Sequence, residues 1–172
     1  MVRLAGALLA RAMLVILLGL GAALPARAQD VGLPIGTVPD AVELEDLDGN
    51  AVNLGAITRG RPAIIQFWAT WCPICSQLQP SFQAVRRQHG DAVDIIYVAV
   101  GVNQNPRTIR RHLESHPLAG RVLYDARGRA TRAFRAPTTS YVVALDATGR
   151  VVYTGVGGEQ DIASAAARAV GR

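Results

Sequence analysis

The spacing of apolar and polar residues along the chain predicts an α/β fold built on parallel strands. Residues 63–68 and 93–100 are dense apolar runs, the second rich in β-branched side chains, and both predict buried strands. The mixed segment 76–89 between them predicts a helix, which Pro80 should kink because proline lacks a backbone N–H. Two parallel strands joined by a helix form a right-handed βαβ unit.

The flanking segments extend this unit into a mixed sheet flanked by helices. Residues 41–47 and 51–54 surround the turn signal Asp48-Gly49-Asn50, which predicts an N-terminal β-hairpin. Further helices are predicted at 106–114, 129–135 and 160–170, and further strands at 122–124, 140–145 and 150–154. The predicted order is a hairpin, a βαβ unit with a helical insertion, and a ββα ending.

The start of the chain has the features of an export signal. Arg3 and Arg11 precede a 13-residue apolar core at 12–24. Residues 26–28 match the small-x-small cleavage pattern, so Gln29 would begin the mature chain. The core is shorter than the roughly 20 residues that span a bilayer. The apolar residues 4–9 could nevertheless lengthen it into an uncleaved anchor. We therefore expect a signal peptide at 1–28 and one exported domain at 29–172, with membrane anchoring as the alternative.

Removing this segment changes the charge balance. The segment holds three of the 18 basic side chains and none of the 13 acidic ones, which leaves 15 basic and 13 acidic side chains in residues 29–172. A balance so close to neutrality does not indicate nucleic-acid binding. The remaining 144 residues suit one domain that buries its own core. We expect this domain to be a monomer.

The only two cysteines, Cys72 and Cys75, follow the first buried strand with two residues between them. At the start of the predicted helix, Cys72 would lie where unpaired backbone N–H groups and the positive end of the helix dipole stabilise a thiolate. One turn later, Cys75 would be placed to attack a mixed disulfide formed at Cys72. We interpret Cys72 as the nucleophile and Cys75 as the resolving cysteine of a thiol–disulfide oxidoreductase.

Other uses of the cysteine pair are less consistent with the sequence. A structural disulfide across so short a loop would remove little unfolded-state entropy. A zinc site needs four ligands, and His89, His112 and His116 do not form a second cluster. A copper-handling module, a redox-inert binding domain with a closed disulfide and, more weakly, a peroxidase are the alternatives. We expect no metal and no cofactor beyond the redox-active cysteine pair.

Several motifs carry a family resemblance. They are the segment 67–75 (FWATWCPIC), Pro80, the segment 136–139 (APTT) and the segment 145–150 (LDATGR). Together they resemble the TlpA-like branch of the thioredoxin superfamily, which includes the ResA, CcmG and ScsD types of exported thiol–disulfide oxidoreductase. The resemblance implies a thioredoxin fold with an N-terminal hairpin and a central insertion. It also implies periplasmic exchange with protein thiols and disulfides, with a membrane electron donor of the DsbD, CcdA or ScsB type.

The same resemblance assigns residues to substrate binding. Pro137 should be a cis-proline that faces the cysteines, and the exposed backbone of Ala136 would pair with an extended substrate segment. Thr138, in the same loop, and Trp68, beside the cysteines, are expected to support the site. The residues expected to contact the substrate are Trp71, Pro73, Ile74, Ala136 and Pro137.

Two positions depart from the family pattern. Thioredoxins carry a buried aspartate in the strand before the cysteines, where this chain has Gln66. ResA- and CcmG-like proteins carry a glutamate three residues after the second cysteine, where this chain has Leu78. Such acids are assigned roles in moving the proton of the second cysteine, so the ScsD-like type is the nearer resemblance. We expect Gln66 to support the site by holding a water molecule near Cys75.

Overall fold

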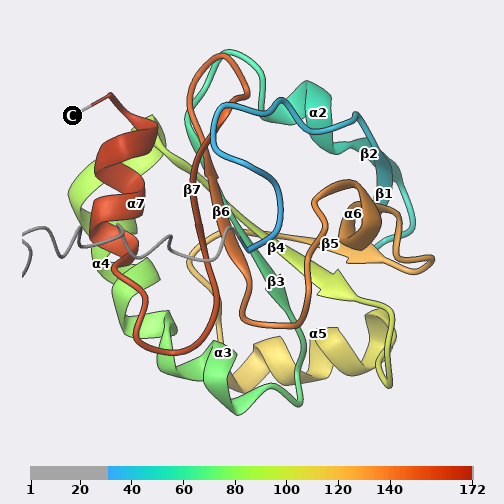
Figure 1. Cartoon of the computed structure of the whole chain (residues 1–172). Coiled ribbons are helices and arrows are strands. Elements are labelled where there is room, and N and C mark those ends of the chain that lie inside the picture. The colour runs from blue at the N-terminus through green and yellow to red at the C-terminus, as the bar shows by residue number, and fades with distance from the viewer. Residues whose placement is uncertain (1–30, 172) are drawn as a thin grey trace, which may run out of the picture.

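The computed structural model describes residues 31–171, which form a seven-stranded mixed sheet with helices on both faces (Figure 1). The strands are β1 (Glu43–Asp46), β2 (Ala51–Asn53), β3 (Ala63–Trp68), β4 (Asp94–Val100), β5 (Arg121–Asp125), β6 (Val142–Leu145) and β7 (Val151–Gly155). The helices are α2 (Leu54–Ile57), α3 (Pro73–Gln77), α4 (Gln79–His89), α5 (Pro106–Ser115), α6 (Arg129–Ala133) and α7 (Ile162–Ala169), with a 3₁₀ turn, η1, at Gly90–Ala92. The predicted signal peptide at 1–28 lies outside the described residues.

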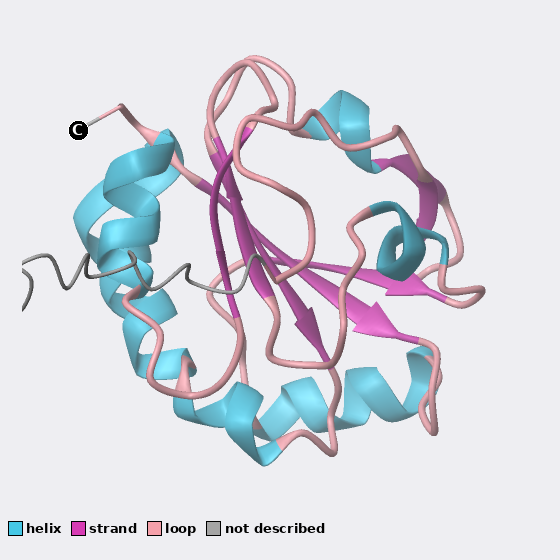
Figure 2. Cartoon of the chain, viewed as in Figure 1, coloured by secondary structure: helices cyan, strands magenta, loops and turns pink. Residues whose placement is uncertain are grey.

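The strand order is β2-β1-β5-β4-β3-β6-β7. The strands β3, β4 and β5 are parallel, as the predicted βαβ unit requires, and β6 and β7 add an antiparallel pair beside β3. The predicted N-terminal hairpin is confirmed as β1 and β2, and β1 pairs with β5 at the far side of the sheet. Figure 2 shows the strands as a central twisted layer with helices around it.

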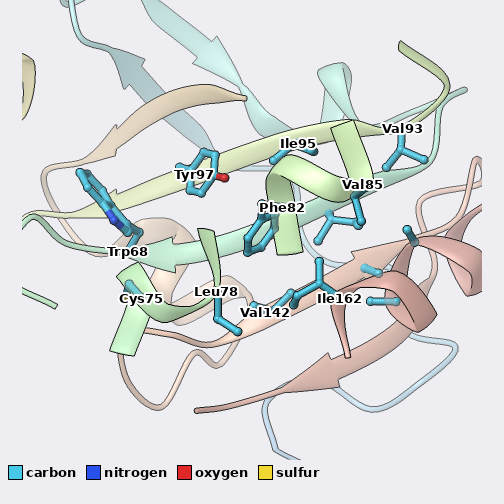
Figure 3. Packing of buried hydrophobic residues seen from close by; sticks show 14 of the residues in the cluster. Trp68, Cys75, Leu78, Phe82, Val85, Val93, Ile95, Tyr97, Val142 and Ile162 are labelled. Carbon is cyan, nitrogen blue, oxygen red and sulfur yellow. The ribbon is translucent and has the colours of Figure 1, made fainter. Parts of the chain in front are cut away.

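Alternating side chains of the central strands enter two cores, one on each face of the sheet. On β3, Ile64 and Trp68 pack into the first core, which lies under α3, α4, α5 and α7, whereas Ile65 and Phe67 pack into the second, under α2 and α6. Figure 3 shows part of the first core, where Phe82 of α4 packs against Tyr97 of β4. Because both faces are covered, β3 is apolar almost throughout, with one polar residue, Gln66, among its buried side chains.

The helix after the cysteines differs from the prediction. Instead of one helix over 76–89 with a kink at Pro80, the chain forms α3 and then α4, and Leu78 lies between them as the cap of both. Pro80 therefore stands in the first turn of α4, where a missing backbone N–H costs nothing. Inside a helix, the ring of Pro80 would clash with the preceding turn, whereas it fits in the first turn. The chain therefore ends α3 and begins α4 just before Pro80.

None of the helices in the described part of the chain has the length and apolar content that crossing a membrane requires.

Candidate active site

The two cysteines lie where β3 leads into α3, and they form a disulfide. Cys72 is the N-cap of α3 in an extended conformation, and its Sγ accepts a hydrogen bond from the backbone N–H of Cys75 at 3.1 Å. Pro73 follows in the first turn, where its missing N–H is tolerated. Cys72 is 5% exposed and Cys75 is 0% exposed. An incoming thiolate therefore reaches the sulfur of Cys72 more readily than that of Cys75.

Trp71 directly precedes Cys72 and is exposed. Its side chain is 46% exposed, and its indole Nε1 donates a hydrogen bond to the backbone oxygen of Val102 at 2.8 Å. A groove of about 540 Å³ runs from Trp71 to the loop 136–139, and a second hollow of about 370 Å³ lies between Trp71 and α5. The groove thus brings together Trp71, Ala136, Pro137 and Thr138, which the sequence placed at a common site.

The prediction of a cis-proline at Pro137 is not supported. The bond before Pro137 is trans, since residues 31–171 contain no cis peptide bond. The trans form is favoured at Xaa-Pro bonds by about 0.5–1 kcal/mol unless the surrounding structure selects the other. Pro137 and Thr138 are exposed in the loop between α6 and β6, while Ala136 is partly buried. This loop extends further than predicted, and β6 begins at Val142 rather than at residue 140.

The residue that joins this loop to β3 is Ser140, which the sequence did not single out. Its N–H donates to the backbone oxygen of Phe67 at 2.8 Å, and its φ of 67° lies in the left-handed region. The side chain of Gln160 donates to the Ser140 oxygen at 2.8 Å and to the Gly157 oxygen at 2.7 Å. These contacts hold the end of the loop against the strand that carries the cysteines.

On the other side of the disulfide, α3 meets the loop after β7. Ile74 is 43% exposed. A Cβ atom added at Gly158 would lie 2.1 Å from Oε1 of Gln77 and 3.5 Å from Cγ2 of Ile74, so the loop approaches α3 closely and excludes a side chain at Gly158. Ile74 therefore lies on a different side of the cysteines from the groove at Trp71. The residues predicted to contact the substrate thus lie in two places: Trp71, Ala136 and Pro137 line the groove, and Ile74 lies beside the loop at Gly158.

Gln104, another residue missed from the sequence, ties the segment after β3 to the end of β4. Its Oε1 accepts a hydrogen bond from the Thr70 N–H at 2.9 Å, and its Nε2 donates to the oxygens of Val100 at 2.7 Å and Trp68 at 3.5 Å. The Gln104 side chain is nearly buried, at 7% exposure. In the sequence, the one indication of this role was a polar residue in the loop after an apolar strand. The partners of Gln104 could not be predicted, because the packing of the sheet brings them together.

Gln66 is buried and belongs to a partly buried chain of hydrogen bonds. Its Oε1 accepts from Nε2 of Gln79 at 3.1 Å, and the same nitrogen donates to the Cys75 backbone oxygen at 3.1 Å. Oε1 of Gln79 accepts from the hydroxyl of Tyr97 at 2.9 Å. Leu78, at the position of the family glutamate, is instead buried in the apolar core. The polar side chain of α4 that contacts the Cys75 backbone is therefore that of Gln79, one position after the family glutamate.

Trp68 packs in the core behind the cysteines rather than at the surface. It is 2% exposed and meets His112 edge to face, with ring centroids 5.7 Å apart, and His112 stacks on His116 at 4.4 Å. Burial, followed by the nearby His116, lowers the pKa of His112 below its ordinary value. Within residues 31–171, no three His, Cys, Asp or Glu side chains are grouped so as to hold a metal ion.

Comparison with known proteins agrees with this arrangement. Residues 34–170 match the Redoxin family. The chain is 33% identical over 121 residues to the methylamine utilization protein MauD of Paracoccus denitrificans, an alignment that covers 70% of this chain and 58% of MauD. It is 26% identical over 146 residues to the sporulation thiol-disulfide oxidoreductase A of Bacillus subtilis, covering 83% of this chain and 86% of that protein. The chain thus spans little more than half the length of MauD.

Solved structures show the same fold. A candidate thiol:disulfide interchange protein DsbE from Chlorobium tepidum superposes with a TM-score of 0.67 at 22% identity, covering 78% of this chain and 99% of that one. The predicted α/β thioredoxin fold with an N-terminal hairpin is therefore confirmed. Family match, fold and cysteine motif agree, and the chain belongs to the Redoxin family, within the TlpA-like branch of the thioredoxin superfamily.

Proposed function

We propose that this protein is an exported thiol–disulfide oxidoreductase that exchanges disulfides with protein partners. The observation that carries the proposal is the Cys72–Cys75 disulfide at the N-terminus of α3, whose more accessible cysteine directly follows Trp71, a residue that lines an open groove. The similarity to a relative named as a thiol-disulfide oxidoreductase supports the proposal. The chemistry needs no cofactor beyond the cysteine pair, because the pair itself carries the two electrons.

The proposed roles of the cysteines follow from their positions. In the reductase direction, the Cys72 thiolate attacks a partner disulfide, a mixed disulfide forms, and the Cys75 thiolate displaces the reduced partner. The backbone N–H of Cys75, 3.1 Å from Sγ of Cys72, supports negative charge on the nucleophile. Because Cys75 is buried, a partner sulfur can react with it only after that sulfur has bonded to Cys72, as expected for a resolving cysteine. The oxidase direction is the same path reversed.

Exposed apolar side chains around the disulfide favour a protein partner. Of six large apolar side chains exposed in residues 31–171, four lie in the segments that surround the disulfide: Trp71, Ile74, Val102 and Val156. Exposed apolar groups gathered at one place mark interaction surfaces. We propose that a partner segment lies in the groove between Trp71 and the loop 136–139, and that Pro73 and Ile74, on the other side of the cysteines, contact a different part of the same partner.

The location of the protein is part of the proposal. The sequence of residues 1–28 has the pattern of an export signal, which supports periplasmic delivery of residues 29–172 as one domain. Two cysteines that cycle in the periplasm need a source of electrons to act as a reductase. A membrane donor of the DsbD, CcdA or ScsB type would supply them.

The test combines a redox titration with trapping of partners. The reduction potential of the Cys72–Cys75 pair is measured by equilibration with glutathione or dithiothreitol buffers. A value near about −270 mV would indicate a reductase and a value near about −120 mV an oxidase. The variant Cys75→Ser should accumulate mixed disulfides through Cys72 in periplasmic extracts, whereas Cys72→Ser should not. A pair that neither buffer opens would refute the function.

A further inference from the structure

The amide of Gln66 has one orientation that its neighbours permit. Nε2 of Gln79 faces both the backbone oxygen of Cys75 and the side chain of Gln66, each at 3.1 Å. A backbone oxygen only accepts, so the Gln79 atom in this position must be the nitrogen. The Gln66 atom that meets this nitrogen must then be its oxygen. The Gln66 Nε2, with two N–H donors, therefore points away from Gln79.

Burial leaves these donors without a partner. Gln66 is 0% exposed, and its Nε2 is the one buried side-chain nitrogen or oxygen in the described residues that has no hydrogen-bond partner. Leaving such a group unpaired is costly, and native structures rarely do so without a reason. The side chain of Gln66 lies on the same face of β3 as that of Trp68, in the layer that also holds Cys75.

The other end of the chain of hydrogen bonds holds Gln66 in place. The hydroxyl of Tyr97 donates to Gln79 at 2.9 Å, and burial raises the pKa of Tyr97 well above its ordinary value, so the hydroxyl stays a donor. The ring of Tyr97 is itself held against Phe82, with centroids 5.4 Å apart. Donation thus runs in one direction, from Tyr97 through Gln79 to Gln66.

In this layer, Sγ of Cys75 is the group whose capacity to accept a hydrogen bond changes when the disulfide opens. Sγ of Cys75 lies 3.9 Å from the backbone oxygen of Phe67, the residue after Gln66, and Gln79 bridges Gln66 to Cys75. A disulfide sulfur is a weak acceptor, whereas a thiolate is a strong one. A donor kept for the thiolate would be unsatisfied while the disulfide is closed, as observed for Gln66.

We propose that the Gln66 amide donates a hydrogen bond to the Cys75 thiolate when the disulfide opens, and that Gln79 and Tyr97 are positioning residues that aim this donor. The proposal rests on the proposed function. In the opening step, a partner thiolate attacks Sγ of Cys72. The partner S–Cys72 bond forms, the Cys72–Cys75 bond breaks, and the electron pair stays on Sγ of Cys75 as a thiolate. In the reverse step, that thiolate attacks Cys72 and releases the partner thiolate.

A neutral amide differs from a carboxylate in what it can do here. It donates a hydrogen bond, which favours the thiolate, but it cannot take up the thiol proton. The proton of the Cys75 thiol must then leave to solvent. The rate of the resolving step, in which Cys75 attacks the mixed disulfide, should consequently follow the ionisation of Cys75 itself, since Gln66, Gln79 and the protonated Tyr97 are all neutral.

The experiment titrates Cys75 alone. In Cys72→Ser, Cys75 is the only thiol of the chain, and its thiolate is followed by ultraviolet absorbance against pH. Adding Gln66→Leu removes the donor, and adding Gln66→Glu keeps the oxygen that faces Gln79 but replaces the free N–H groups. Both should move the titration midpoint upward by about one pH unit, a tenfold loss of thiolate at fixed pH. Adding Tyr97→Phe should give a smaller upward shift with the ring packing retained.

The control is Thr58→Val, added to the same Cys72→Ser background. Thr58 is also buried and donates a side-chain hydrogen bond, to the oxygen of Leu54 at 3.0 Å, but it belongs to the opposite face of the sheet. It should leave the Cys75 midpoint unchanged. An unchanged midpoint in both Gln66 variants would overturn the inference even if the wild-type protein exchanges disulfides. Failure of the wild-type pair to open in redox buffers would refute the proposed function instead.

Discussion

Replacing Gln104 by alanine tests whether this side chain holds the active-site segment in place. The substitution removes two hydrogen bonds of ordinary length, at 2.9 Å to the Thr70 N–H and 2.7 Å to the Val100 oxygen, and a long one of 3.5 Å to the Trp68 oxygen. Each ordinary bond contributes about 1 kcal/mol net, and the partners left unpaired in a nearly buried place add to the loss. We expect the free energy of unfolding to fall by about 2–3 kcal/mol.

Thermal unfolding measures this loss. For a chain of this size each kcal/mol corresponds to about 3 °C in Tm, so Gln104→Ala should unfold roughly 6–9 °C earlier than the wild type. Gln104→Glu keeps the acceptor for Thr70 but turns an oxygen toward the Val100 carbonyl, so it should be at least as destabilising. Gln88→Ala, at an exposed position of α4, is the matched control and should change Tm little.

The same variant has a functional consequence. Gln104 holds the backbone of Thr70, and the next residue, Trp71, reaches Val102 through its indole. A looser segment should slow exchange with a protein disulfide more than reduction by dithiothreitol, because only the protein substrate uses the surface around Trp71. If Gln104→Ala and Gln88→Ala had equal Tm values and equal exchange rates, the side chain would not be holding the segment.

Further predictions concern the core, the histidine in α5 and a close backbone contact. Phe82→Ala should cost about 3–5 kcal/mol in denaturant unfolding, because Phe82 is 0% exposed and packs on Tyr97; a loss below about 1 kcal/mol would contradict that packing. Burial lowers the pKa of His112, so the folded state favours the neutral ring. The stability that the neutral ring contributes is present above about pH 6.5 and is lost as the pH falls from there through the lowered pKa. In His112→Gln, this part of the pH dependence of the free energy of unfolding should disappear. Gly120→Ala would place a Cβ 2.0 Å from the backbone oxygen of Ile95, so the variant should be less stable or insoluble. If its Tm equalled that of the wild type, β4 and the start of β5 would be able to separate there.

Short-range patterns in the sequence carry most of the fold. The apolar run at β3, the β-branched run at β4 and the turn signal between β1 and β2 each correspond to an element within a few residues. Burial on both faces of a parallel sheet demands continuous apolar strands, and hairpin turns demand particular residues, so these elements are visible locally. The placement of Cys72 at a helix start followed from the same local reasoning.

The details of the active site depended on contacts between distant segments. The loop 136–139 lines the same groove as Trp71, yet the expected cis bond at Pro137 is absent and Ser140 makes the contact with β3. An Xaa-Pro bond has two forms of similar energy, so its isomer is selected by the surrounding structure and not by the local sequence.

The sequence by itself determined the alternation of strands and helices, the cysteine pair at the start of a helix and the membership of the family, because period, capping and motif spacing are local properties. Only the tertiary structure decided that the helix breaks at Leu78 and that Gln79, rather than Leu78, meets Gln66 and Tyr97 beside Cys75. Those three residues come from β3, α4 and β4. Their hydrogen bonds exist only after the sheet and the helix pack, because burial removes water as the competing partner.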